Sequence, residues 1–230
     1  MKLLAFETAT EACSVALYID GEIRERFEIA PKLHTQLALP WAEQLLADAG
    51  IKKSQLDAIA VGIGPGAFTG VRLAVALVQG IALALDKPVL PVSTLAALAM
   101  QGADIKAEKI LAAIDARMGE IYCAEFRLNT DGLVDAMSAE IVIAPEAYCA
   151  ESDISFVGVG TGFSANNNAL QNNLKSQLIA CRADALPHAS DVLKLALRDY
   201  ALGKMMAPDN LEPAYLRNKV ALTLREQGKA

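Results

Sequence analysis

The sequence has few of the residues that build metal centres, disulfide frameworks or nucleophilic triads. Its 230 residues include four cysteines, scattered without a C-x-x-C pair, and two histidines, His34 and His188, far apart in the chain. Such spacing is typical of neither a zinc site nor a disulfide-stabilised secreted domain, and no G-x-S-x-G motif is present. We therefore expect reduced, mostly buried thiols, no catalytic residues and no metal site.

Positive charge and long apolar runs are also scarce. Lys and Arg number 21 against 27 Asp and Glu, a net charge of -6, so we expect no autonomous nucleic-acid binding. The longest uncharged apolar stretch, 73–85, has 13 residues, fewer than the roughly 20 that a membrane-spanning helix needs. Glu7 and Glu11 interrupt the apolar start where a signal peptide requires an unbroken run. The sequence predicts a soluble protein that makes no membrane contact.

Apolar residues are abundant, at 53%, and their spacing predicts alternating strands and helices. In the first part we expect strands at 2–8, 14–20, 22–29, 58–63 and 89–92, and helices at 35–49, 71–85 and 94–100. After a polar break at 102–108 we expect strands at 109–116, 120–128, about 133–143, 155–159 and 177–181, and a long helix at 189–202. This order predicts an α/β protein with two lobes, residues 1–104 and 105–230.

The two parts of the chain share one local pattern. The stretch VGIGPGAF at 61–68 is mirrored by VGVGTGF at 157–163, and each is a glycine-rich exit from a buried strand. A repeated strand-to-helix unit of this kind favours an internal duplication. We expect each lobe to contain a mixed sheet flanked by helices.

The glycine-rich loop at 64–70 is the strongest local candidate for a site. Backbone N–H groups that converge before a helix can hold an anion or nucleotide, and the residues concerned are Gly64, Gly66, Thr69 and Gly70. No Lys follows Gly70, so the P-loop pattern is incomplete, and the next strand ends without an acid to hold a ribose. A tight strand-to-helix connection is the competing interpretation.

Two acidic residues, Glu7 in FETAT and Asp115 in IDARMGE, end predicted strands. Actin-like and hexokinase-like folds place carboxylates at such positions, facing a metal-bound phosphate. The first position carries Glu rather than Asp and lacks a following Gly. We expect a solvated or hydrogen-bonded turn residue at both.

The predicted helix at 71–85 is apolar on opposite sides. Val71, Val75 and Val78 fall on one face at 100° per residue, and Leu77 and Gly80 fall nearly opposite. One face can pack on a sheet, whereas the other needs a further helix layer or a partner chain. Small residues at 76, 80 and 84 would allow that neighbour to approach closely.

The motifs FETAT, GPGAFTGVRLAVALVQGIA, VSTLAALA, DARMGEIYCAEF and PAYLR resemble the TsaB (YeaZ) family over essentially the whole chain, in the right order. The resemblance implies an actin-like ATPase (ASKHA) fold in two pseudo-duplicated lobes and a cytoplasmic location. It also implies a scaffold role in making N6-threonylcarbamoyladenosine at position 37 of ANN-decoding tRNAs. The implied partners are TsaD, which transfers the threonylcarbamoyl group, the ATPase TsaE, and tRNA through the complex.

The resemblance also bears on individual residues. TsaD holds a metal with an H-x-x-x-H pair, and here His34 matches the first histidine while Ala38 replaces the second, so that metal site cannot form. Gln36 departs from the Glu that is common in the family. In the family the first two helices form the interface with TsaD or, in the isolated protein, with a second copy. The expected interface residues are Leu37, Trp41, Leu45, Leu73, Ala76, Leu77, Gly80 and Ala84.

Three matters stay open at this point. The first is the alternative that the chain is an independent ASKHA-type enzyme, a kinase or a glycoprotease-like metallopeptidase, against which the loss at Ala38 and the Glu at position 7 both count. The second is whether a nucleotide binds at the partner interface. The third is whether the basic end of the chain, with Arg217, Lys219, Arg225 and Lys229, contacts tRNA.

Overall fold

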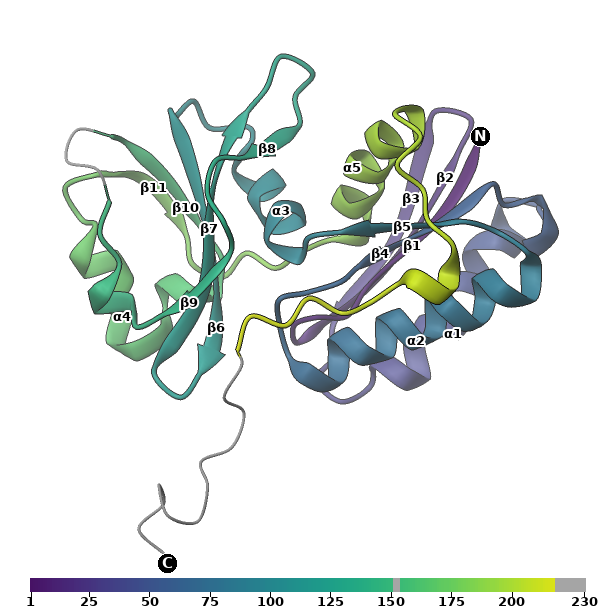
Figure 1. The fold of residues 1–230 in the computed structure, drawn as a ribbon, viewed down its shortest axis with the longest axis horizontal. Helices are drawn as coiled ribbons and strands as arrows, with labels where there is room; N and C mark the ends of the chain where they lie inside the picture. Colours follow the sequence, from purple (N-terminus) through teal and green to yellow (C-terminus); the bar gives the residue numbers. More distant parts are fainter. Residues whose placement is uncertain (151–153, 218–230) are drawn as a thin grey trace, which may run out of the picture.

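The computed structural model describes residues 1–150 and 154–217, and two mixed β-sheets with helices around them dominate it (Figure 1). The first sheet has the order β3-β2-β1-β4-β5. Its strands are β1 (Lys2–Glu7), β2 (Ala12–Ile19), β3 (Glu22–Ile29), β4 (Ala58–Gly62) and β5 (Val89–Val92). The first three strands are antiparallel, and β4 and β5 join parallel to β1.

The second sheet has the order β11-β10-β6-β7-β8, with β9 also paired to β7. Its strands are β6 (Lys109–Arg117), β7 (Glu120–Leu128), β8 (Val134–Ala136), β9 (Ile141–Ile143), β10 (Phe156–Val159) and β11 (Leu178–Arg182). In the order β8-β7-β6-β10-β11, this sheet repeats the first. Neighbouring strands among β8, β7 and β6 are antiparallel, and β10 and β11 then follow parallel to β6. The predicted two-lobed α/β duplication is confirmed.

The helices form layers on both sides of the two sheets. They are α1 (His34–Asp48), α2 (Phe68–Leu85), α3 (Thr94–Ala99), α4 (Ala165–Asn173) and α5 (Ala189–Ala201). Helices α1 and α2 cover one face of the first sheet, and α3 and α5 lie between the two sheets in a core shared by both lobes (Figure 1). Helix α4 covers the outer face of the second sheet.

Three features differ from the sequence prediction: one strand, the start of α2 and the burial of the cysteines. The strand expected to end near 143 is two short strands, β8 and β9, that both pair with β7. Helix α2 begins at Phe68, so Thr69 and Gly70 belong to its first turn rather than to the preceding loop. Of the four free cysteines, Cys149 is exposed and Cys181 half-buried, so burial of the thiols is less general than expected.

The earlier start of α2 gives it 18 residues, and among the described residues it is the one helix long and apolar enough to cross a membrane by length and composition. The expectation that the apolar stretch is too short for this is therefore corrected. Core helices of soluble proteins pass the same test, and one buried face of α2 packs on the first sheet.

The chain after the second sheet returns to the first lobe. Helix α5 packs on β1, β2, β4 and β5, and the segment that follows runs back across α2 toward the second lobe (Figure 1). We call residues 206–217 the C-terminal strap. Met206 exchanges backbone hydrogen bonds with Val89, and the Ala214 N–H donates to the Ile63 carbonyl. The division of the chain at residue 104 stays a prediction.

Candidate functional site: the exposed face of α2 and the cleft between the lobes

Helix α2 separates its residues into a buried and an exposed stripe, as its periodicity predicts. Val71, Val75, Val78 and Ala82 are each at most 4% exposed and pack on the first sheet. The helix ends where Asp86 takes a left-handed conformation (φ 52°), a common helix stop. The packing therefore presents the opposite face of α2 to solvent.

The exposed stripe of α2 is apolar and uncovered. Ala76, Gly80 and Ala84 are exposed, and Leu73 and Leu77 are half-buried beside them. A Cβ added at Gly80 would meet nothing within 4 Å, so the stripe is open to solvent at Gly80. Leu83, 55% exposed, widens the apolar surface. Internal packing accounts for part of the second apolar face, because Leu77 packs against the first-lobe core, and it leaves Ala76, Gly80 and Ala84 exposed.

Helix α1 contributes less to this surface than expected. Leu37 and Trp41 are half-buried against the core of the first lobe, and Leu45 is only 4% exposed inside it. Leu39, 42% exposed, points outward instead. We drop Leu45 from the expected interface because its side chain is used internally.

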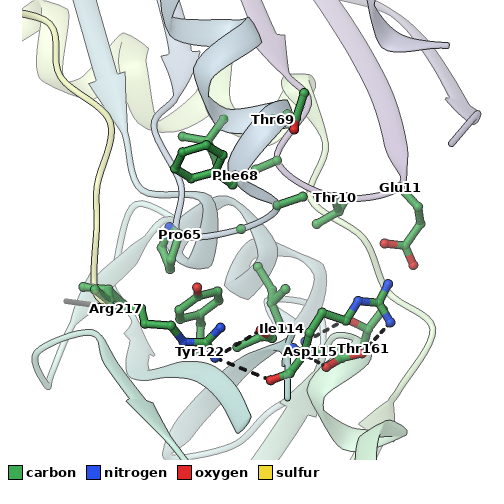
Figure 2. A pocket seen from close by; sticks show the side chains of 18 of the residues that line it. Thr10, Glu11, Pro65, Phe68, Thr69, Ile114, Asp115, Tyr122, Thr161 and Arg217 are labelled. Carbon is green, nitrogen blue, oxygen red and sulfur yellow. Dashed lines mark hydrogen bonds and ion pairs between the residues drawn. The ribbon is translucent and has the colours of Figure 1, made fainter. Parts of the chain in front are cut away.

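A cavity of about 970 Å³ lies between the lobes. Figure 2 shows Pro65 and Phe68 on its first-lobe side, facing Ile114, Tyr122 and Arg217. Arg217, from the C-terminal strap, donates to Glu120 and to the backbone carbonyl of Ala116 in the second lobe. The strap thus connects both walls of the cleft.

The glycines of the loop before α2 allow close backbone packing. A Cβ at Gly66 would lie 2.3 Å from the Ala9 carbonyl oxygen, and one at Gly70 would lie 2.0 Å from the Thr8 carbonyl oxygen. The Ala67 N–H donates to the Ala9 carbonyl oxygen at 2.7 Å. These contacts fit a tight strand-to-helix connection. Binding of an anion or nucleotide at this loop stays a prediction.

The two acidic strand-end residues have different surroundings. Glu7 is 1% exposed and accepts hydrogen bonds from the Ala9 N–H (2.7 Å) and the Thr94 hydroxyl (2.9 Å), whose oxygen accepts the Gly64 N–H at 3.0 Å. Burial raises the pKa of Glu7 to about 7, against the lowering effect of these hydrogen bonds. Asp115 instead faces the cleft and pairs with Arg117 at 2.8 Å. Both side chains are hydrogen-bonded, but the expectation of turn residues is wrong, because Glu7 pairs with Ser14 within the first sheet and Asp115 pairs with Ile121 within the second.

His34 has a structural contact in place of a metal ligand. Its Nε2 lies 3.0 Å from the Thr10 carbonyl oxygen and 3.1 Å from the Ala12 carbonyl oxygen, so this nitrogen donates as N–H. Ala38, four residues on, is buried in the core. In the described part of the chain, no group of three or more His, Cys, Asp or Glu residues could hold a metal ion.

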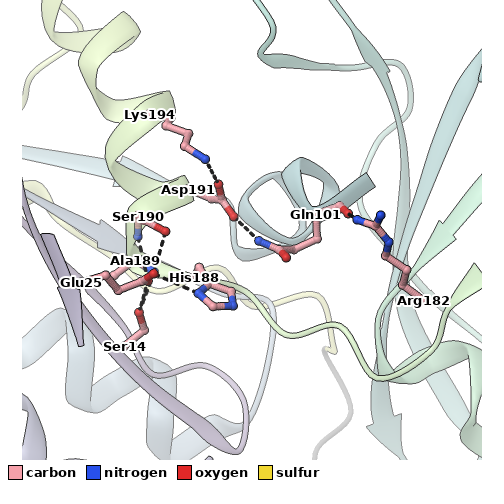
Figure 3. A network of polar contacts seen from close by, with 9 residues as sticks. All are labelled: Ser14, Glu25, Gln101, Arg182, His188, Ala189, Ser190, Asp191 and Lys194. Atoms are coloured by element: carbon pink, nitrogen blue, oxygen red, sulfur yellow. Dashed lines mark hydrogen bonds and ion pairs between the residues drawn. The ribbon is translucent and has the colours of Figure 1, made fainter. Parts of the chain in front are cut away.

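Sequence reasoning missed a polar cluster at the start of α5 (Figure 3). The Glu25 carboxylate accepts from the Ser14 hydroxyl (2.6 Å), the Ser190 N–H (3.1 Å) and His188 Nδ1 (3.1 Å). Burial raises the pKa of Glu25, but these hydrogen bonds outweigh it and hold the pKa at about 2. No sequence signal pairs residues this far apart. The cluster anchors α5 to the first sheet.

Comparison with known proteins agrees with this architecture. Residues 27–223 match the family model described as TsaD: tRNA N6-adenosine threonylcarbamoyltransferase. The Escherichia coli K12 protein named tRNA threonylcarbamoyladenosine biosynthesis protein TsaB is 42% identical over 227 residues, 96% of each chain. The protein of the same name from Haemophilus influenzae is 37% identical and covers 96% of this chain and 95% of its own.

Solved structures are similar over nearly the same length. The structure titled YeaZ from Pseudomonas aeruginosa is 42% identical with a TM-score of 0.84, over 94% of this chain and 99% of its own. A second, with the same identity and coverage and a TM-score of 0.87, is described as an uncharacterized protein with similarity to peptidase YEAZ from Pseudomonas aeruginosa. These likenesses confirm the predicted resemblance and the two-lobed actin-like ATPase fold.

Proposed function

Since the chain belongs to the family described by the TsaD model, and within it to the TsaB (YeaZ) group, we propose that it is a non-catalytic accessory subunit of tRNA threonylcarbamoyladenosine synthesis. In this role it binds and stabilises TsaD, together with TsaE, so that TsaD can transfer threonylcarbamoyl to adenosine 37 of ANN-decoding tRNAs. The observation that carries the proposal is the exposed apolar stripe of α2.

The proposed binding surface is formed by the exposed residues of α2 and the adjoining part of α1. Monomeric proteins rarely expose a contiguous apolar helix face, and such a face marks a contact with another chain. The small side chains along it allow a partner helix to approach to the short end of the roughly 8–10 Å range of interaxial distances. We propose that TsaD occupies this surface in the complex and that a second copy occupies it in a homodimer when TsaD is absent.

The proposal assigns tRNA and nucleotide contacts to the complex rather than to this chain alone. The chain is acidic overall, which supports tRNA binding mainly through the partner. Of the basic residues near the end of the chain, Arg217 is engaged with Glu120, and Lys219, Arg225 and Lys229 lie outside the described residues. The proposal also includes a nucleotide bound at the interface between this chain and its partner.

The competing function is an independent ASKHA-type kinase or metallopeptidase. One similar structure is described by its likeness to a peptidase. Against an enzyme of this kind, His34 is engaged with two backbone carbonyls, and Ala38 supplies no ligand. The carboxylate of Glu7 is buried behind the loop rather than directed into the cleft.

The test is transfer of threonylcarbamoyl from its adenylate to tRNA, reconstituted with purified TsaD and TsaE in the presence and absence of this chain. We expect transfer only when the chain is present, and expect the chain alone to hydrolyse neither ATP nor peptides. Elemental analysis should find no stoichiometric zinc or iron. One equivalent of tightly bound metal that is lost in His34→Ala, or activity of the isolated chain, would refute the accessory role.

A further inference from the structure

The first turns of α2 and the C-terminal strap bring together three side chains from two distant motifs, GAFTGVR and PAYLR. The guanidinium carbon of Arg72 lies 3.7 Å from the centroid of the Phe68 ring and 5.5 Å from that of Tyr215. Arg72 Nε donates to the Tyr215 hydroxyl at 2.7 Å. The guanidinium is therefore held in one orientation by two aromatic faces and a hydrogen bond.

This arrangement leaves the charge of Arg72 without a carboxylate among the described residues. Six other described arginines each form an ion pair with Asp or Glu: Arg24, Arg26, Arg117, Arg182, Arg198 and Arg217. The two terminal nitrogens of Arg72 donate to no described group, and the first turn of α2 contains no acidic residue. A fixed guanidinium with a free outer edge matches a carboxylate, which accepts two parallel N–H bonds.

The position of Arg72 connects it with the proposed interface. Arg72, Ala76 and Gly80 follow one another at four-residue spacing and are all exposed, so they lie on one face of α2. Phe68 and Tyr215, 51% and 50% exposed, border the same surface. A charge on an apolar contact surface is costly unless the partner provides its opposite. This charge complementarity indicates an acidic group on the partner.

We propose that Phe68, Arg72 and Tyr215 form a carboxylate-binding site that receives an Asp or Glu side chain of the protein docked on α2. Arg72 makes the contact, and Tyr215 is a positioning residue that holds Nε and leaves the outer edge of the guanidinium free. The inference rests on the proposed function, because it requires a partner on this face. It also gives the C-terminal strap a part in partner recognition.

The experiment measures the affinity of the full chain for its cognate TsaD by calorimetry at low and high salt. We expect Arg72→Gln to weaken binding at least tenfold and to reduce its salt dependence, and Arg72→Lys to restore little, because lysine lacks the planar fork. Tyr215→Phe, which keeps the ring but removes the hydroxyl, should weaken binding severalfold. Arg127→Gln, at an exposed arginine of β7 that forms no ion pair with a described residue, should bind normally.

Two outcomes separate this inference from the proposed function. Normal binding by Arg72→Gln, when Gly80→Arg abolishes binding, overturns the carboxylate site and leaves the α2 interface standing. Normal binding by both variants overturns the interface itself. A parallel titration with inorganic pyrophosphate checks the ligand class: if Arg72→Gln loses pyrophosphate binding but keeps TsaD binding, the site takes phosphate and the proposal is wrong. Unchanged melting temperatures show that the variants are folded.

Discussion

The two lobes share one sheet topology but differ in the helices on the outer face of each sheet, which are α1 and α2 in the first lobe and α4 in the second. In the first lobe α2 has 18 residues and a single strongly charged side chain, Arg72, and exposes an apolar stripe. In the second lobe α4 has nine residues, ANNNALQNN, and buries only Leu170. The exposed surface of the first lobe is thus apolar along α2, whereas that of α4 in the second lobe is rich in Asn. The proposed function depends on the surface of one lobe rather than on the fold.

The largest expected effect is at the centre of the α2 stripe. Gly80→Arg would place an unpaired charge in a dry contact, so we expect a loss of several kcal/mol in binding to TsaD, on the order of a hundredfold or more. The variant should remain folded, because a side chain at Gly80 meets open space. Sedimentation measures binding to TsaD, and circular dichroism measures whether the variant is folded.

Asn172→Arg on α4 is the matched control, because Asn172 is exposed on the equivalent layer of the second lobe. We expect it to assemble like the unmodified chain. Equal losses in the two variants would show that charge, rather than the α2 surface, disturbs assembly.

The second effect concerns the buried carboxylate at the end of the first strand of the first lobe. The pKa of Glu7 is raised from 4.5 to about 7 in the folded chain, so the folded state holds this proton more tightly than the unfolded state. Stability should therefore fall as the pH rises from 4.5 to about 7, by about 3 kcal/mol, and change no further above it. Urea unfolding of Glu7→Gln over this range should lack that fall.

The third effect tests the return of α5 to the first lobe. Glu25→Gln should lower the free energy of unfolding by about 2 kcal/mol near pH 6, because it removes charge-assisted hydrogen bonds. Burial lowers the pKa of His188, but Glu25 raises it overall. The stabilisation by His188 is thus complete below pH about 6.5 and lost as the pH rises through the raised pKa, and that by Glu25 is lost as the pH falls from 4.5 toward 2.

The same strand contains a control for this third effect. Glu22 is an exposed acidic residue of β3 that, within the described part of the chain, forms an ion pair only with the surface residue Arg24. Glu22→Gln should therefore leave the unfolding free energy and its pH dependence nearly unchanged. A similar loss in both variants would indicate a general charge effect rather than the anchoring of α5.

The smallest effect is expected at the acidic residue of the second lobe. Asp115 pairs with Arg117, whose side chain is 81% exposed, and exposed ion pairs contribute about 0–1 kcal/mol. Thermal unfolding of Asp115→Asn should differ from that of the unmodified chain by no more than this. A loss as large as that expected for Glu7 would contradict the contrast between the two strand ends.

The sequence by itself determined most of the element order, the duplication and the two-faced character of α2, but not the division of the strand expected at about 133–143 into β8 and β9. These follow from local periodicity: the valines at 71, 75 and 78 repeat with the helix, and the VGIGPG and VGVGTG stretches repeat along the chain. The glycine-rich connection was also predictable, since glycine tolerates the close approach that the Thr8 and Ala9 carbonyls require.

Only the tertiary structure decided which groups from distant segments meet. It buried Leu45, left the Ala76–Gly80–Ala84 stripe uncovered and joined Arg72 to Tyr215. It also placed α5 on the first sheet, where Glu25 and His188 meet. Periodicity states that a side chain lies on a face but not what covers that face. Burial, pKa shifts and ion pairing depend on the segments that pack on each face, and these segments lie far apart in the sequence.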